Sequence, residues 1–104
     1  MKKILNYING ELLESVEGNY LENHNPSNGQ VYSLIPDSGK QDIDNAVAAA
    51  KEAFKTWSKT SKQERSDILM KLADKIEEYF DELVEAESKD NGKPETLAAH
   101  VDIP

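Results

Sequence analysis

The sequence contains no cysteine. Disulfide bonds, thiolate metal sites and a cysteine nucleophile are therefore excluded from these 104 residues. Any covalent chemistry that needs a thiolate would have to come from another polypeptide segment.

No apolar run in the chain approaches the length that spans a membrane. The start, Met1-Lys2-Lys3, is charged, but neither a long apolar stretch nor a small-residue cleavage site follows it, so it does not resemble a signal peptide. We therefore expect no membrane contact and a cytoplasmic location.

The chain also lacks a cluster of lysine and arginine residues, and its net charge is −8. Nucleic acids and anionic membranes are polyanions that attract basic patches, so neither is an expected partner. The lysines lie among carboxylates, as in the segment Lys71–Glu78, which is typical of a solvated helix face.

Common catalytic motifs are missing as well. There is no Gly-x-Ser-x-Gly elbow and no Gly-x-Gly-x-x-Gly or phosphate loop, because the five glycines are dispersed. The two histidines, His24 and His100, are far apart in sequence and have no carboxylate at metal-ligand spacing. The segment Asp37–Asp42 lacks the ligand alternation and closing glutamate of a calcium loop. We expect no active site within the chain.

The first 37 residues predict strands and turns. Leu5–Ile8 and Leu12–Leu13 flank Asn9-Gly10, a pair that tolerates positive φ at both central positions of a tight hairpin turn. Tyr20–His24 and Val31–Ile35 flank a turn with an Asn-Pro and an Asn-Gly pair, which predicts a second hairpin.

Residues 38–104 predict helices. The first should begin near Gly39 or Lys40, with Ser38 and Gln41 as a capping box, and should end near Trp57. Its apolar stripe contains residues at helical spacing: Ile43, Ala46, Val47, Ala50, Phe54 and Trp57.

A second helix should open at Ser61, which forms a Ser-x-x-Glu capping box with Glu64, and should kink or restart near Asp81. Gly92 is a predicted C-terminal cap, and Glu95–Val101 is a predicted further helix. The fold class predicted from the residues alone is α+β. We divide the chain into a β-hairpin segment, 1–37, and a helical segment, 38–104.

The order of several motifs resembles the N-terminal stretch of the aldehyde dehydrogenase superfamily over almost the whole chain. These motifs are Tyr7–Glu11, Asn25–Val31, Ile43–Phe54 with Trp57, Gln63–Ser66 and Glu87–Pro94. Three phrases, Ser38–Lys40, Ala86–Asp90 and Val101–Pro104, resemble the 2-aminomuconic and 2-hydroxymuconic semialdehyde dehydrogenases. Betaine-aldehyde-type relatives share similar phrases.

The resemblance implies that the hairpins and first helices are an incomplete part of an α/β coenzyme-binding domain. It also implies a parent enzyme that oxidises an aldehyde, with NAD or NADP as cofactor, and that is a homo-oligomer. The family's cysteine nucleophile, activating glutamate, oxyanion asparagine and dinucleotide contacts all lie in later sequence. We therefore expect no catalytic or cofactor-binding residue here, and no NAD(P) bound by this chain alone.

The resemblance implies one candidate site, for a potassium or sodium ion. Some family members bind a monovalent cation through two carbonyls before the Asn-Pro turn and one acid, and the matching positions are Asn23, His24 and Asp90. Carbonyl and carboxylate oxygens suit a hard cation. The alternative is that Asp90 only forms a local hydrogen bond near a helix end.

Three interpretations of the whole chain follow. The first is the N-terminal piece of an aldehyde dehydrogenase, inactive alone, whose partner is the rest of that polypeptide. The apolar ending Val101–Pro104 favours a truncation. The second is a stand-alone, non-catalytic interaction module that associates with a full-length enzyme. The third is an unrelated acidic helical adaptor. The first predicts an exposed apolar patch, because the hairpins cannot cover both helical stripes.

Overall fold

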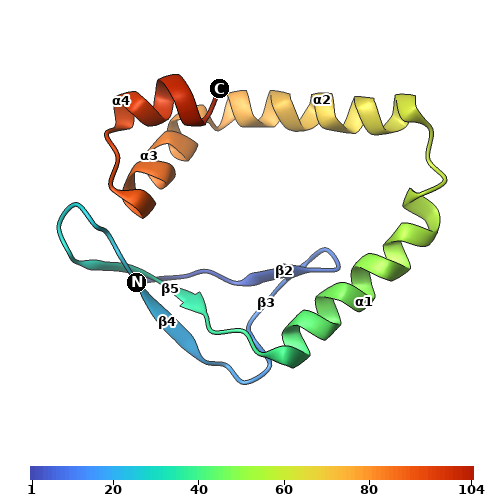
Figure 1. Cartoon of the computed structure of the whole chain (residues 1–104), viewed down its shortest axis with the longest axis horizontal. Helices are drawn as coiled ribbons and strands as arrows, with labels where there is room; N and C mark the ends of the chain where they lie inside the picture. The colour runs from blue at the N-terminus through green and yellow to red at the C-terminus, as the bar shows by residue number, and fades with distance from the viewer. The chain divides into compact units, whose positions relative to one another are not determined.

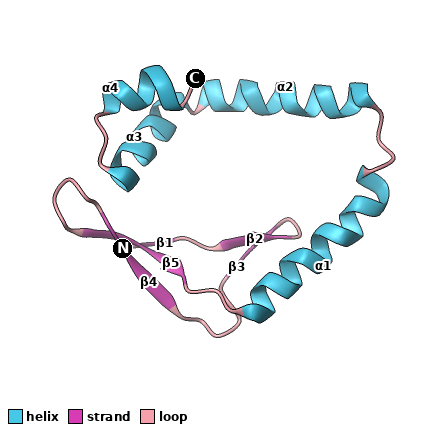
Figure 2. Ribbon diagram, in the orientation of Figure 1, coloured by secondary structure: helices cyan, strands magenta, loops and turns pink.

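The computed structural model describes all 104 residues, Met1–Pro104. Five strands come first and the helices follow, which confirms the predicted α+β class (Figures 1 and 2). Contacts divide the chain into two compact units, Met1–Asn23 with Val31–Thr60, and His24–Gln30 with Ser61–Pro104. This division follows a different criterion from the predicted boundary between residues 37 and 38, which stays a prediction.

The first unit contains the predicted tight hairpin. Strands β2 (Asn6–Ile8) and β3 (Glu11–Leu13) pair antiparallel, with Ile8 opposite Glu11. Asn9 and Gly10 have φ values of 53° and 79°, the positive angles that a two-residue turn between twisted strands requires.

A three-stranded sheet has the order β1-β5-β4. Strands β4 (Tyr20–His24) and β5 (Val31–Pro36) are the predicted second hairpin. The two-residue strand β1 (Lys2–Lys3) pairs parallel with β5, and Lys2 lies opposite Ser33. The sequence did not predict β1, because two lysines carry no strand pattern of their own.

Helix α1 (Lys40–Trp57) begins and ends where the sequence predicted, but its cap differs. The N-cap is Gly39, and the Asp42 Oδ2 accepts a hydrogen bond of 2.9 Å from the Gly39 N–H. The predicted box of Ser38 and Gln41 is therefore wrong by one position. Asp42 replaces Gln41 because its carboxylate sits three residues after the cap and is the stronger acceptor.

The second unit begins its helices at Ser61. The Ser61 Oγ accepts a hydrogen bond of 3.1 Å from the Glu64 N–H and caps α2 (Lys62–Glu78), as predicted. The helix breaks at Tyr79, whose φ of −103° and ψ of 23° are not helical, and α3 (Phe80–Asn91) follows. This break is the predicted restart, placed two residues before Asp81.

Gly92 ends α3 in the left-handed conformation, with a φ of 79°, which confirms the predicted C-terminal cap. A short helix, α4 (Glu95–Leu97), runs directly into one π-helical turn, η1 (Ala98–Asp102). The Ile103 N–H donates to the Ala98 carbonyl at 3.1 Å, the five-residue span of a π turn. The predicted helix at Glu95–Val101 is thus present in this mixed form.

The apolar core is small. Only Val84 and Ala98 are buried among the apolar residues, at 8% and 0% exposure. By contrast, the apolar stripe of α1 is open to solvent, with Ile43 60% and Phe54 64% exposed. On α2, Leu69 is also 64% exposed. The predicted exposure of apolar side chains is confirmed. No helix in the chain has the length and apolar character to cross a membrane, and the cytoplasmic location stays a prediction.

Candidate functional site

Within the second unit, the end of α3 lies against the Asn-Pro turn. A Cβ placed on Gly92 would stand 2.9 Å from the Pro26 Cγ and 3.8 Å from the Ser27 Oγ. The turn itself is rigid, because the Gly29 N–H donates to the Asn25 carbonyl at 2.7 Å. This contact joins two of the motifs that carry the family resemblance.

The loop after Gly92 is held by polar groups on both sides. The Ser88 Oγ donates to the Lys93 carbonyl at 2.7 Å, and the Lys93 N–H donates to the Asn91 Oδ1 at 2.9 Å. The Lys93 ammonium lies 2.6 Å from Asp102 and 3.9 Å from Glu87. The hydrogen bond to Asp102 raises the pKa of Lys93 above its ordinary value of 10.5, against a smaller lowering by burial. Lys93 is therefore a structural cation that joins α3 to η1.

The predicted cation ligands fall in both units. His24 and Asp90 belong to the second unit, and Asn23 to the first. The Asn23 side-chain amide donates to the Tyr32 hydroxyl at 3.0 Å and to the Ser33 Oγ at 3.1 Å. No group of three or more His, Cys, Asp or Glu side chains could hold a metal ion. That finding does not test a site built from carbonyls and one acid, so the ion stays a prediction.

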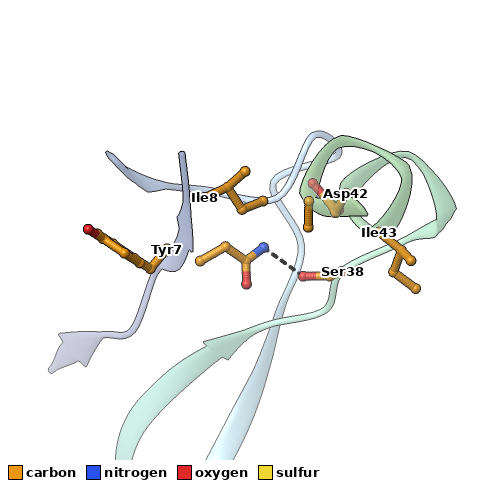
Figure 3. A pocket seen from close by; sticks show the side chains of 7 residues that line it. Tyr7, Ile8, Ser38, Asp42 and Ile43 are labelled. Atoms are coloured by element: carbon orange, nitrogen blue, oxygen red, sulfur yellow. Dashed lines mark hydrogen bonds between the residues drawn. The ribbon is translucent and has the colours of Figure 1, made fainter. Parts of the chain in front are cut away.

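A small pocket lies in the first unit, where α1 contacts β2 (Figure 3). It has a volume of about 220 Å³ and is lined by Asn6, Tyr7, Ile8, Ser38, Asp42, Ile43 and Ala46. The Asn6 side-chain amide donates to the Ser38 Oγ at 2.8 Å. In Figure 3 the Tyr7 ring points away from Ser38. Such a volume is below the usual range of ligand sites.

Asp42 is the buried acid of this pocket, at 6% exposure. Its Oδ1 accepts from the Val16 N–H and its Oδ2 from the Gly39 N–H, each at 2.9 Å. Each oxygen thus accepts one backbone hydrogen bond, so Asp42 holds the 14–18 loop against the start of α1. The sequence signal was an acid three residues after Gly39, which the Ser38 interpretation overlooked.

A second pocket lies within the second unit, beside the last residues of the chain. It has a volume of about 410 Å³ and is lined by Ala73, Ile76, Glu77, Phe80, Ile103 and Pro104. Glu77 is its one ionisable group. Most of the other lining side chains are apolar, so the pocket offers mainly apolar contact.

The residues present do not fit a dinucleotide. Four of the five glycines, Gly10, Gly18, Gly29 and Gly92, have positive φ, and each serves a separate turn or helix end. The fifth, Gly39, is the N-cap of α1, and none of the five belongs to a glycine-rich phosphate loop.

Comparison with known proteins identifies the class. The fold matches an aldehyde dehydrogenase structure from Bartonella henselae with a TM-score of 0.95 at 28% identity, over 99% of this chain and 22% of that one. A family model described as the aldehyde dehydrogenase family matches residues 13–104. The chain belongs to the aldehyde dehydrogenase family.

Semialdehyde dehydrogenases are among the relatives by sequence. The 2-aminomuconic semialdehyde dehydrogenase of Mus musculus is 50% identical over 95% of this chain and 20% of its own length. The 2-hydroxymuconic semialdehyde dehydrogenase of Pseudomonas sp. (strain CF600) is 47% identical over 100% of this chain and 22% of its own length. The resemblance predicted from the motifs is thereby confirmed. The chain spans about a fifth of the length of these relatives.

Proposed function

We propose that this chain is the N-terminal segment of an enzyme that oxidises an aldehyde, of the semialdehyde class, to a carboxylic acid with NAD or NADP. The support is the similarity to two semialdehyde dehydrogenases over at least 95% of the chain. Within that enzyme the segment is a scaffold, since it holds no cysteine and no base placed beside a nucleophile.

The exposed apolar faces are the observation that carries the scaffold role. On α1, Ile43, Val47 and Phe54 are open to solvent, and on α2 so are Leu69 and Leu72. Soluble monomers rarely expose large apolar patches, and we propose that a partner covers these faces. The remaining four-fifths of a family-length polypeptide is the partner that we propose, in a homo-oligomeric, cytoplasmic enzyme.

The cofactor proposal follows from structures of relatives. A structure of PnpE was determined in complex with nicotinamide adenine dinucleotide, and it matches with a TM-score of 0.94 at 38% identity, over 100% of this chain and 21% of that one. We propose the same cofactor class for the parent enzyme, bound by residues outside this chain.

A potassium or sodium ion at the Asn23 and His24 carbonyls and the Asp90 carboxylate is a further part of the proposal. The contact between Gly92 and Pro26 supports it, because it brings the end of α3 to the turn that follows His24. Replacing Asp90→Asn should abolish any difference in unfolding temperature between potassium and choline chloride. An ion-dependent difference that survives in Asp90→Asn would contradict the assignment.

A complementation experiment tests the function. The 104-residue chain is mixed with the Pseudomonas relative from which the matching segment has been removed, and NADH formation on a muconic semialdehyde is followed. Neither part should be active alone, and the mixture should be. Phe54→Asp on the α1 face should weaken the rescue, whereas Lys40→Ala, in an exposed ion pair, should not.

The other outcomes are equally informative. NADH formation by the chain alone would overturn the scaffold role. Binding to a full-length relative, without rescue of the shortened one, would favour the alternative function of a stand-alone interaction module.

A further inference from the structure

Three asparagines are each followed by glycine: Asn9-Gly10, Asn28-Gly29 and Asn91-Gly92. In such a pair the glycine backbone nitrogen can attack the side-chain amide carbon of the asparagine, because no side chain hinders its approach. Attack requires that this nitrogen and the asparagine side chain are both able to leave their present hydrogen bonds. The three pairs differ in this respect.

Exposure to water does not separate the three pairs, since Asn9, Asn28 and Asn91 are all exposed. Hydrogen bonding does. In the Asn-Pro turn, the Gly29 N–H donates to the Asn25 carbonyl at 2.7 Å, and the Asn28 Oδ1 accepts from the Gln30 N–H at 2.9 Å. Both reacting groups of this pair are therefore held.

The pair at the end of α3 is held in the same way. The Gly92 N–H donates to the Ser88 carbonyl at 2.9 Å, and the Asn91 Oδ1 accepts from the Lys93 N–H at 2.9 Å. The Asn91 amide also donates to Glu87. Pro26 packs against Gly92 and limits the motion of this backbone further.

The hairpin pair has no such restraint. The structure gives no hydrogen bond to the Gly10 N–H and none to the Asn9 side chain. The pairing of Ile8 with Glu11 closes the hairpin around the turn without using either group. No atom lies within 4 Å of the position that a Cβ on Gly10 would take, so the turn is open on that side.

We propose that Asn9 is a site of spontaneous deamidation, selected over Asn28 and Asn91 by the native fold. The Gly10 nitrogen forms a bond to the Asn9 Cγ and loses its proton, and the Asn9 side-chain nitrogen leaves as ammonia. The five-membered succinimide is then opened by one water molecule, at either carbonyl, to give aspartate or isoaspartate. No oxidation or reduction takes place, and water is the only co-reactant.

The modification alters the hairpin. Either product adds one negative charge beside Glu11. Isoaspartate also inserts a methylene group into the backbone of a turn that has only two residues, so β2 and β3 lose the register in which Ile8 lies opposite Glu11.

The experiment incubates the full chain in mildly alkaline buffer and measures the acid content of each peptide by mass spectrometry after digestion. In the folded chain Asn9 should convert roughly tenfold faster than Asn28 or Asn91, since two hydrogen bonds protect each of the latter. In urea the three rates should become similar, because all three pairs then have the same local sequence chemistry. Circular dichroism follows the folded state during incubation.

Two matched variants complete the test. Asn9→Gln should remove the fast step, because the larger ring forms slowly, and Asn28→Gln should leave the fast step unchanged. Equal rates at the three sites in the native buffer, or faster conversion at Asn28 or Asn91, would overturn the proposal.

Discussion

Asp42 and Val16 are joined across 26 residues by a hydrogen bond of 2.9 Å, from the Val16 N–H to the Asp42 Oδ1. The same carboxylate accepts from Gly39 through its second oxygen. One side chain therefore fixes both the start of α1 and the loop that follows β3. Substitution of Asp42 should therefore disturb two segments of the first unit at once.

Replacing Asp42→Ala should lower the free energy of unfolding by about 1–3 kcal/mol, because two backbone N–H groups lose their acceptor. The free energy of unfolding of Asp42→Asn should lie between those of the wild type and Asp42→Ala, since an amide keeps one acceptor oxygen. Urea unfolding measures the change. As the control, Asp44→Ala removes an exposed ion pair with Lys40 and should cost about 0.5 kcal/mol or less. Equal losses at both positions would refute the bridging role.

Gly92→Ala should destabilise the chain by roughly 1–3 kcal/mol, because it combines a left-handed backbone with a clash against Pro26. Gly10→Ala provides the matched control, since Gly10 has the same φ of 79° and no neighbour within 4 Å. The loss at Gly92 should therefore exceed the loss at Gly10. In the double variant with Pro26→Ala, the difference between the two glycines should shrink, and its persistence would show that Pro26 is not responsible.

The ion pair of Lys93 and Asp102 should make stability depend on alkaline pH. The pKa of Lys93 is raised in the folded chain, so its contribution is fully present below the ordinary pKa of 10.5 and is lost as the pH rises through the folded value. In Asp102→Asn the unfolding temperature should depend less on pH in this alkaline range. Lys55→Met, which removes an exposed pair with Glu52, should leave the profile unchanged.

The exposed face of α1 should bind a hydrophobic dye and promote self-association. Val47→Gln and Phe54→Gln together should reduce dye fluorescence and shift the chain toward monomer in sedimentation, with little loss of stability, because neither residue is buried. The exchange of two exposed polar residues on α2, Lys71→Gln and Asp74→Asn, is the control. A monomer that binds no dye before mutation would contradict the open face.

The sequence was sufficient where a local motif decides the structure. Asn9-Gly10 predicted the first turn, Ser61 the start of α2, and Gly92 the end of α3. Each of these features depends only on local backbone angles or on one nearby hydrogen-bond acceptor. The family resemblance came from the order of such motifs, and the family match over residues 13–104 confirms it.

Non-local interactions could not be predicted in the same way. The contact of Gly92 with Pro26 and the bond from Val16 to Asp42 join residues far apart in sequence, and neither has a local pattern. The predicted cation site at Asn23, His24 and Asp90 has the same difficulty. Its geometry depends on whether two carbonyls and a carboxylate far away in sequence come together. The spacing of residues in the sequence does not predict this.

The parallel pairing of β1 with β5 has a consequence for the order of events during synthesis. Lys2 and Lys3 leave the ribosome before their partners Ser33 and Leu34, and both hairpin turns lie between them in the chain. The β2–β3 hairpin needs only neighbouring residues and can form while the chain is still growing. Strand β1 therefore cannot pair until the much later strand β5 has been made.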